Sequence, residues 1–234
     1  MRVTIGNFLF RTRNALFPLL YLTLFVSQQQ VSQNAVAMLL AGAAVALLGQ
    51  GIRVLTVGLD YIVRGGRQRK VYADSLVQTG LFAHCRNPLY LGNLLMIIGF
   101  GVAANNPWYL AIAMPLFFLG YACIIAAEET YLLGRFGDDY RHYCARTPRL
   151  LPRLAGMSET LRTFAFNWRR VVVKEYTTLC MTLLMLVLLA ARALHADARG
   201  WIISAGLIIL ILLACCAVRI LKKSGRLHAG SPRQ

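Results

Sequence analysis

The sequence predicts an all-α fold, a polytopic helical bundle in a membrane with about six transmembrane helices and cytoplasmic N- and C-termini. Apolar residues make up 58% of the chain and charged residues only 15%, whereas soluble domains carry about 25% charge. The apolar residues fall in long runs separated by polar or basic segments. The net charge of +16 then reflects the Lys and Arg that membrane proteins keep in cytoplasmic loops, and it does not indicate nucleic acid as a partner.

Residues 1–71 form the N-terminal part, with the first two predicted helices and a basic cytoplasmic loop at 64–70. The first helix covers 15–26 after an arginine-containing flank, and the second covers 35–59. Ala and Gly are frequent in the second helix, which favours close packing against a neighbouring helix. We interpret Arg53 in this helix as a side chain that snorkels to the membrane surface. The alternative is that it faces a polar cavity.

Residues 72–155 contain a predicted helical hairpin, which is the core of the chain. Its two apolar runs, 89–104 and 108–127, are separated only by Asn105-Asn106-Pro107. Two membrane-spanning helices joined by so short a turn run antiparallel. The open ends of the hairpin therefore return to the same membrane face.

Polar clusters occupy both open ends of the hairpin, and we expect them to meet in space. The first cluster runs from Arg86 to Tyr90, and the second is the pair Glu128 and Glu129. Each has a simple structural explanation, since Pro88 suits the first turn of a helix and acidic residues occur at solvated helix ends. However, carboxylates at a helix C-terminus oppose the helix macrodipole and favour a cationic partner. Arg86 or a positively charged ligand can supply that charge, which indicates a site.

The C-terminal part consists of a basic segment, 156–175, and a second helical hairpin with a basic tail, 176–234. The basic segment is predicted either to lie on anionic lipid as an interfacial helix or to form a linker docked on the bundle. In this topology only Arg192 and Arg199 of the 25 Lys and Arg residues fall on the outer side. The polar clusters of the central hairpin therefore face the cytoplasm.

Cysteine and histidine patterns give no indication of a metal site. The six cysteines form no C-x-x-C pair, and the four histidines are scattered along the chain. Neither a zinc site nor a disulfide framework is expected from such spacing.

The polar motifs of the central part follow one another in a characteristic order around the hairpin. Over residues 67–154 they resemble the isoprenylcysteine carboxyl methyltransferase and phospholipid methyltransferase superfamily. Any single motif is weak evidence, whereas the ordered set is specific. The residues that carry the resemblance are Gly80, Phe82, Arg86, Asn87, Pro88, Tyr90, Gly92, Glu128, Glu129, Phe136, Gly137, Tyr140, Tyr143, Arg146, Pro148 and Pro152.

The resemblance implies an integral membrane methyltransferase that uses S-adenosylmethionine. Glu128 would place negative charge beside the ammonium or sulfonium of the cofactor. Glu129 would orient an amine or hydroxyl acceptor or support the site from outside it, and the proton of an amine acceptor would pass to Glu129, Tyr90 or water. The implied catalytic residues are Glu128, Glu129 and Tyr90. The implied cofactor-binding residues are Ser75, Leu76, Val77, Phe82, Arg86, Asn87, Pro88, Leu89, Tyr90 and Glu128.

The chain departs from the superfamily pattern at two positions. Asn87 stands where the isoprenylcysteine enzymes usually have His. Ile124 occupies the substrate position where those enzymes have the Arg that holds the substrate carboxylate. An apolar side chain cannot neutralise a carboxylate in a site of low dielectric constant. We therefore do not expect a prenylcysteine carboxylate as the substrate.

The expected reaction is methyl transfer to a lipid or isoprenoid-type acceptor dissolved in the membrane. The expected partners are this hydrophobic acceptor and an anionic membrane surface, without nucleic acid or metal. Two alternatives are a membrane NADPH-dependent reductase of related architecture and a non-catalytic membrane scaffold that keeps the motif for packing. The length of 234 residues favours the methyltransferase over the reductase, because the reductases are generally longer.

Overall fold

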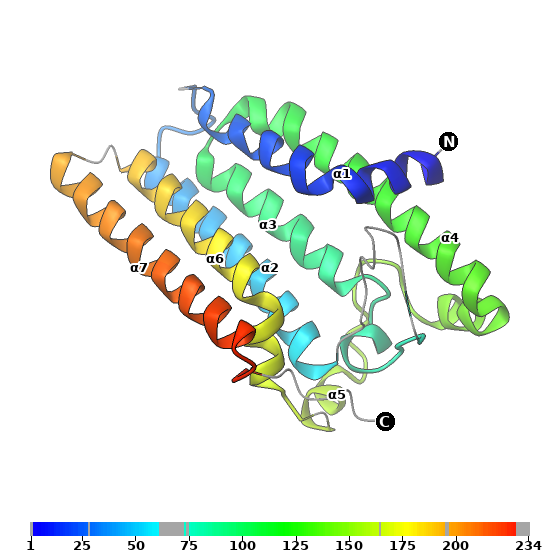
Figure 1. The fold of residues 1–234 in the computed structure, drawn as a ribbon. Coiled ribbons are helices and arrows are strands. Elements are labelled where there is room, and N and C mark those ends of the chain that lie inside the picture. Colours follow the sequence, from blue (N-terminus) through cyan, green and yellow to red (C-terminus); the bar gives the residue numbers. More distant parts are fainter. Residues whose placement is uncertain are drawn as a thin grey trace.

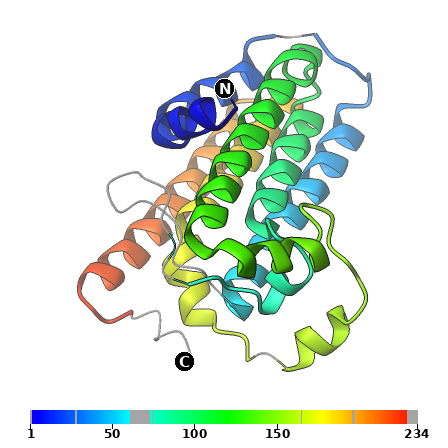
Figure 2. The same cartoon turned by 90° about the vertical axis from the view of Figure 1, so that its right-hand side faces the viewer.

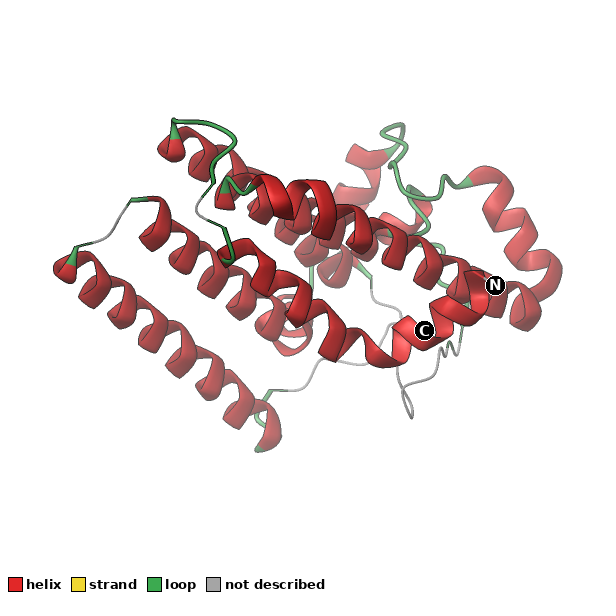
Figure 3. Cartoon of the chain, turned by 90° about the horizontal axis from the view of Figure 1, so that it is seen from above, coloured by secondary structure: helices red, strands yellow, loops and turns green. Residues whose placement is uncertain are grey.

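The computed structural model describes residues 2–27, 29–60, 73, 75–163, 165–194 and 197–227, and in these residues all regular structure is helical. The prediction of an all-α fold is thereby confirmed. Figures 1 and 3 show the long helices packed side by side in a bundle. The elements are α1 (Arg2–Leu22), η1 (Thr23–Phe25), α2 (Ala35–Leu59), η3 (Gly80–Ala83), α3 (Pro88–Ala104), η4 (Tyr109–Ala113), α4 (Met114–Arg146), α5 (Met157–Thr163), α6 (Trp168–Ala193) and α7 (Ala198–Lys223).

In the described part of the chain, four helices are long and apolar enough to cross a membrane. They are α2, the continuous helix Tyr109–Arg146, α6 and α7, and Pro88–Ala104 is a shorter apolar helix. α1 begins at Arg2, before the predicted start, and so includes the arginine-containing flank. The chain thus has the helices of an integral membrane protein. Six crossings and cytoplasmic termini remain predictions.

Helices α2 and α3 touch through their backbones, because glycines face each other along the contact. A Cβ atom added to Gly49 would lie 2.5 Å from the carbonyl oxygen of Gly92. A Cβ atom on Gly99 would lie 2.6 Å from the carbonyl oxygen of Gly42. Side chains at these positions would force the helices apart. The Ala- and Gly-rich face of α2 therefore packs against α3 of the same chain.

The hairpin of α3 and α4 turns at two asparagines, as the short interruption in the sequence predicted. Asn105 adopts the left-handed conformation, with φ of 53°, which Asn tolerates better than most residues. The Asn106 side chain accepts hydrogen bonds from the backbone amides of Trp108 and Tyr109, at 3.0 and 3.3 Å. These bonds satisfy free donors at the start of the next helix.

The turns at this end of the bundle are tied together by hydrogen bonds. The side chain of Asn105 donates to the carbonyl oxygen of Ser32 at 2.7 Å. That of Asn106 donates to the carbonyl oxygen of Thr23 at 3.0 Å. Arg192, at the end of α6, donates to the carbonyl oxygens of Leu24 and Ser27.

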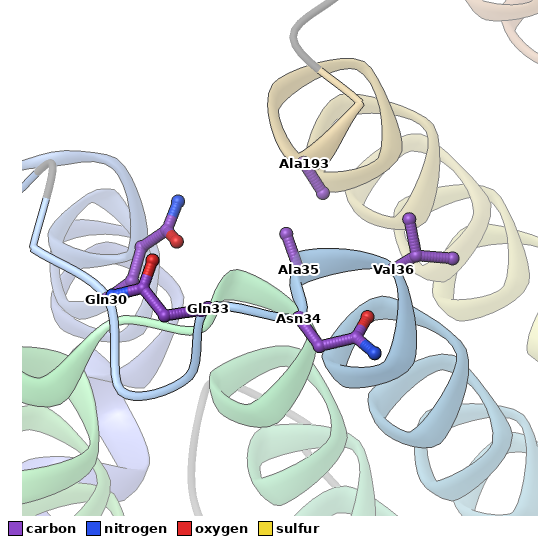
Figure 4. A pocket seen from close by; sticks show the side chains of 6 residues that line it. All are labelled: Gln30, Gln33, Asn34, Ala35, Val36 and Ala193. Carbon is purple, nitrogen blue, oxygen red and sulfur yellow. The ribbon is translucent and has the colours of Figure 1, made fainter.

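A hollow of about 580 Å³ opens at the same end. Figure 4 shows that polar side chains of the segment before α2 surround it, together with the end of α6. The candidate functional site lies at the opposite end of the bundle. The hollow is lined by Gln30, Gln33, Asn34, Ala35, Val36 and Ala193.

Candidate active site

The two polar clusters of the hairpin meet, as the sequence predicted. The Tyr90 hydroxyl, in the first turn of α3, donates a hydrogen bond of 2.6 Å to the Glu128 carboxylate of α4. The Tyr90 residue is 7% exposed and Glu128 is 5% exposed. A buried carboxylate is costly unless it is hydrogen-bonded or paired. This contact therefore explains how the acid Glu128 is kept in the buried part of the bundle.

Glu129 has different surroundings from its neighbour, although the two acids are adjacent in the chain. One of its carboxylate oxygens lies 2.8 Å from the guanidinium of Arg149, and the other lies 3.6 Å from that of Arg86. The Asn87 side-chain amide donates to Glu129 at 3.4 Å. Glu129 is thus the centre of a polar network that ties α4 to the segments around it.

Asn87 precedes α3 but does not cap it with its side chain. Asn is a preferred capping residue at this position, where its side-chain oxygen usually accepts a backbone N–H. Here its amide group donates to Glu129 and, at 3.1 Å, to the carbonyl oxygen of Arg149. The Asn87 side chain therefore joins the polar network around Glu129 and does not cap the helix. Pro88 follows in the first turn, where no amide donor is lost.

Arg86 is held on several sides and keeps its charge. Its backbone amide donates to the Pro148 carbonyl at 2.9 Å, and its guanidinium donates to the Cys144 sulfur at 2.6 Å. Burial lowers the pKa of Arg86, but the nearby Glu129 and Cys144 raise it by more, so that the pKa ends above its ordinary value. Its buried Nε atom has no hydrogen-bond partner among the described residues. Arg86 therefore offers an unused donor to an anionic group.

A segment from 148 to 153, here named the covering segment, runs along the start of the motif. The thiol of Cys85 donates to the Leu150 carbonyl at 3.0 Å, and the Arg153 amide donates to the His84 carbonyl at 3.0 Å. The His84 ring joins this segment to α5, because its nitrogens lie 2.8 Å from the Arg153 carbonyl and from the Thr160 hydroxyl. Figure 2 shows the connection after α4 passing beside the start of α3.

The Phe-Gly-x-x-Tyr motif forms a sharp bend in α4. Gly137 has φ of 54° and ψ of −121°, a conformation that is essentially restricted to glycine. After the bend, Tyr140 and Tyr143 pack with Leu132 in a small apolar cluster. The Tyr143 hydroxyl donates to the Phe82 carbonyl at 2.7 Å. Because of the bend, the end of α4 reaches and holds η3, which lies shortly before the Arg86–Tyr90 run.

The remaining predicted cofactor residues differ in exposure. Phe82 is fully buried, whereas Ser75 is exposed. Leu76 and Val77 are half-buried, and Leu76 packs against the cluster of Leu132, Tyr140 and Tyr143. Leu89 is half-buried beside the buried Pro88. Leu76, Phe82 and the Arg86–Tyr90 run thus gather around the bent end of α4, and Ser75 lies at the surface.

Ile124 is fully buried in the apolar core, one helical turn before Glu128. Tyr90 and Tyr121 belong to the same core cluster. The position that carries a cation in the isoprenylcysteine enzymes is therefore a packed apolar position in this chain.

Arg149 was not predicted from the sequence as a partner of Glu129. The arginines in and before the covering segment could have suggested this contact, since paired acids favour nearby cations.

The interpretation of Arg53 as a snorkelling side chain is wrong. Its guanidinium makes two bonds of 2.8 and 2.9 Å to Glu175 in α6 and one of 2.6 Å to Asn93 in α3. Glu175, a single acid in a long helix, was the available signal for this pair.

Comparison with known proteins finds a family and two relatives that are similar to part of the chain. Residues 34–139 match the family described as phospholipid methyltransferase. The match includes α2, α3, the Tyr90–Glu128 contact and the bend at Gly137. It confirms, for this part of the chain, the resemblance found in the motifs. Residues 34–139, a little under half of the chain, are therefore similar to the phospholipid methyltransferase family.

Two bacterial proteins are similar to part of the chain. The cobalt-zinc-cadmium resistance protein CzcN of Cupriavidus metallidurans is 33% identical over 107 residues, which is 45% of this chain and 47% of that protein. The nickel-cobalt-cadmium resistance protein NccN of Alcaligenes xylosoxydans xylosoxydans is 34% identical over 105 residues, 45% of this chain and 48% of that protein. The matches thus span about half the length of these relatives. No solved structure matches the chain.

The side chains of the site carry charges that suit the charged groups in the methionine part of S-adenosylmethionine. The Glu128 carboxylate, steadied by Tyr90, is suited to a sulfonium or ammonium cation. The Arg86 guanidinium, with its unused Nε donor, is suited to a carboxylate. Within the described ranges, no three His, Cys, Asp or Glu side chains are grouped so that they could hold a metal ion.

Proposed function

We propose that this protein is an S-adenosylmethionine-dependent methyltransferase that acts on a lipid or isoprenoid-type acceptor in the membrane, with its active site on the cytoplasmic face. The observation that carries the proposal is the buried hydrogen bond of 2.6 Å between Tyr90 and Glu128. It joins the two motifs of the hairpin within the stretch that matches the phospholipid methyltransferase family.

The residues of the site would act mainly by binding and positioning. S-adenosylmethionine supplies an activated methyl group, so the protein needs to align the reactants and exclude water. Glu128 attracts the cationic part of the cofactor, and Arg86 attracts its carboxylate. The Glu129 network and the covering segment hold Arg86 and Asn87 in place from the outside.

The pair of Tyr90 and Glu128 would also receive a proton from an amine or hydroxyl acceptor. The Tyr90 oxygen takes the acceptor proton while its own proton passes to the Glu128 carboxylate, to which it is already hydrogen-bonded. Glu129 is less suited to this role, because it is engaged by Arg149 at 2.8 Å. The structure thus favours Tyr90 over Glu129 among the groups considered from the sequence.

The acceptor is proposed to be hydrophobic and to lack an anionic group at the Ile124 position. Ile124 lies fully buried among apolar side chains, which offer no compensation to a carboxylate. A lipid amine or a hydroxylated isoprenoid would suit these surroundings better than a prenylcysteine.

Isothermal titration calorimetry on the detergent-purified protein tests the proposal, with S-adenosylmethionine, S-adenosylhomocysteine and NADPH as ligands. We expect the first two to bind and NADPH not to bind. Binding of NADPH alone would support the reductase alternative instead. If none of the three binds, with or without added bilayer lipid, the non-catalytic scaffold becomes the better description.

A second proposal is that the activity contributes to resistance against divalent transition metals, because both similar proteins are named for such resistance. Expression of the chain in a metal-sensitive bacterium should then raise the concentration of Co²⁺, Zn²⁺ or Cd²⁺ that permits growth. The Glu128→Gln variant should lose this effect if methyl transfer causes it. Equal protection by the unmodified protein and by the Glu128→Gln variant would show that the resistance does not depend on the proposed active site.

A further inference from the structure

The cytoplasm-facing end of the second hairpin, as predicted from the charges, gathers basic residues from two helices. Figure 1 shows the end of α7 lying beside the first turns of α6. The Lys222 amine of α7 donates to the Val173 carbonyl of α6 at 3.1 Å and lies 5.4 Å from the centre of the Tyr176 ring. We name this group of side chains the α6–α7 basic cluster. It comprises Arg169, Arg170, Lys174, Arg219, Lys222 and Lys223.

Among the described residues, little negative charge lies beside the arginines of the α6–α7 basic cluster or beside Lys222 and Lys223. The first turn of α6 has no acidic residue, and Glu175 in the second turn is buried and bonded to Arg53. Lys174 and Lys222 repel each other across the contact. In the described part of the chain, no ion pair is formed by the arginines of the cluster or by Lys222 and Lys223. Cations at the start of a helix also oppose its macrodipole.

The position of the cluster indicates which anion it meets. α7 buries only Ser204 within the chain, so that most of its apolar surface is available to lipid. Ile220 is 66% exposed directly beside the basic residues, and Trp168 at the start of α6 is 67% exposed. Exposed Trp residues of membrane proteins are enriched at the level of the lipid headgroups. The cluster therefore lies at the depth where lipid phosphates occur.

We propose that the α6–α7 basic cluster binds the phosphate of an anionic phospholipid as a defined headgroup site. Diffuse attraction to a negative surface would require only scattered cations. Here Lys222 of α7 is fixed against a carbonyl and an aromatic ring of α6, and Lys174 of α6 lies near enough to Lys222 to interact with its charge. These residues lie outside the stretch that matches the methyltransferase family, so the site is independent of the proposed methyl transfer.

Native mass spectrometry of the purified protein tests this site, with phosphatidylglycerol and phosphatidylcholine as probes. We expect saturable binding of phosphatidylglycerol. The double variant Lys222→Gln/Lys223→Gln should weaken it about thirtyfold, since each cation near the membrane surface contributes about 1 kcal/mol. The control Arg11→Gln/Arg135→Gln removes the same charge from exposed positions on α1 and α4 and should change the affinity less than twofold.

Equal weakening in both double variants would mean attraction to net charge alone and would overturn the proposal. Equal affinity for phosphatidylcholine would overturn it as well. The variant Arg169→Gln/Arg219→Gln leaves in place Lys222, the cation that contacts Val173 and Tyr176. It provides the same test if replacement of Lys222 disturbs the contact between the helices.

Discussion

Glu128 and Glu129 follow each other on α4, yet they serve different neighbours because of the helix geometry. Successive side chains of an α-helix point about 100° apart. Glu128 consequently faces α3 and Tyr90, whereas Glu129 faces Arg149 and the covering segment. The sequence shows two equivalent acids. Only the orientation of α4 separates a buried acid bonded to Tyr90 from an acid that holds the surrounding segments.

At the residue scale, removal of the Glu128 charge should weaken cofactor binding. We expect Glu128→Gln to raise the dissociation constant for S-adenosylmethionine about tenfold, because one interaction with a cationic group is lost. Tyr90→Phe, which removes only the hydroxyl, should have a smaller effect. Calorimetry measures both.

The matched control for this experiment is Glu159→Gln, which removes an exposed acid on α5. Its dissociation constant should stay within twofold of that of the unmodified protein. An equally small change for Glu128→Gln would show that Glu128 does not contact the cofactor.

Two glycines of α4 allow backbone strain to be separated from packing. Added Cβ atoms at Gly134 and Gly137 would meet nothing within 4 Å, but only Gly137 has a positive φ. Gly137→Ala should therefore lower the free energy of unfolding by about 1–3 kcal/mol through backbone strain. Gly134→Ala should raise it by about 0.5–1 kcal/mol. Unfolding in mixed detergent measures both, and similar effects at the two positions would exclude a special role for the bend.

At the scale of the elements, α6 is joined to α2 and α3 by the buried pair of Arg53 and Glu175. The Arg53 side chain is 13% exposed and that of Glu175 only 4%. Arg53→Met alone should lower the free energy of unfolding by about 3–5 kcal/mol, because an unpaired carboxylate stays buried. The double variant Arg53→Met/Glu175→Met should recover most of this loss, since neither charge remains.

The exposed pair of Arg141 and Asp138 serves as the control for this measurement. Their side chains are 70% and 78% exposed, and such pairs contribute less than about 1 kcal/mol. Arg141→Met should accordingly have little effect in the same unfolding experiment. A double variant of Arg53 and Glu175 that is no more stable than Arg53→Met would mean that packing, rather than charge, dominates at this contact.

The elements were predictable where local sequence determines them. The three-residue turn at 105–107 imposed the antiparallel hairpin, and hence the meeting of Tyr90 with Glu128. The pair of Arg53 and Glu175 was not predictable in this way, since its members are 122 positions apart and charge alone does not identify a partner. The bend at Gly137 was also missed, because a glycine in a helical pattern does not reveal its backbone angles.

At the scale of the whole molecule, the membrane topology is open to direct measurement. We expect the end of the bundle with the hollow to face outward and the site to face the cytoplasm, because nearly all basic residues lie on the site's side. In a cysteine-free background, an impermeant maleimide added to intact cells should label Gln33→Cys but not Ser75→Cys. Both positions are exposed. Labelling of Ser75→Cys alone would reverse the orientation.

The hydrogen bonds that tie the turns at one end of the bundle have a mechanical consequence for the molecule. Asn105, Asn106 and Arg192 fasten three connections to one another at that end. The opposite end is tied as well, by the Tyr90–Glu128 bond and by the ion pairs of Glu129. A helix of the hairpin therefore cannot tilt as a rigid rod without breaking polar bonds at one end of the bundle or the other.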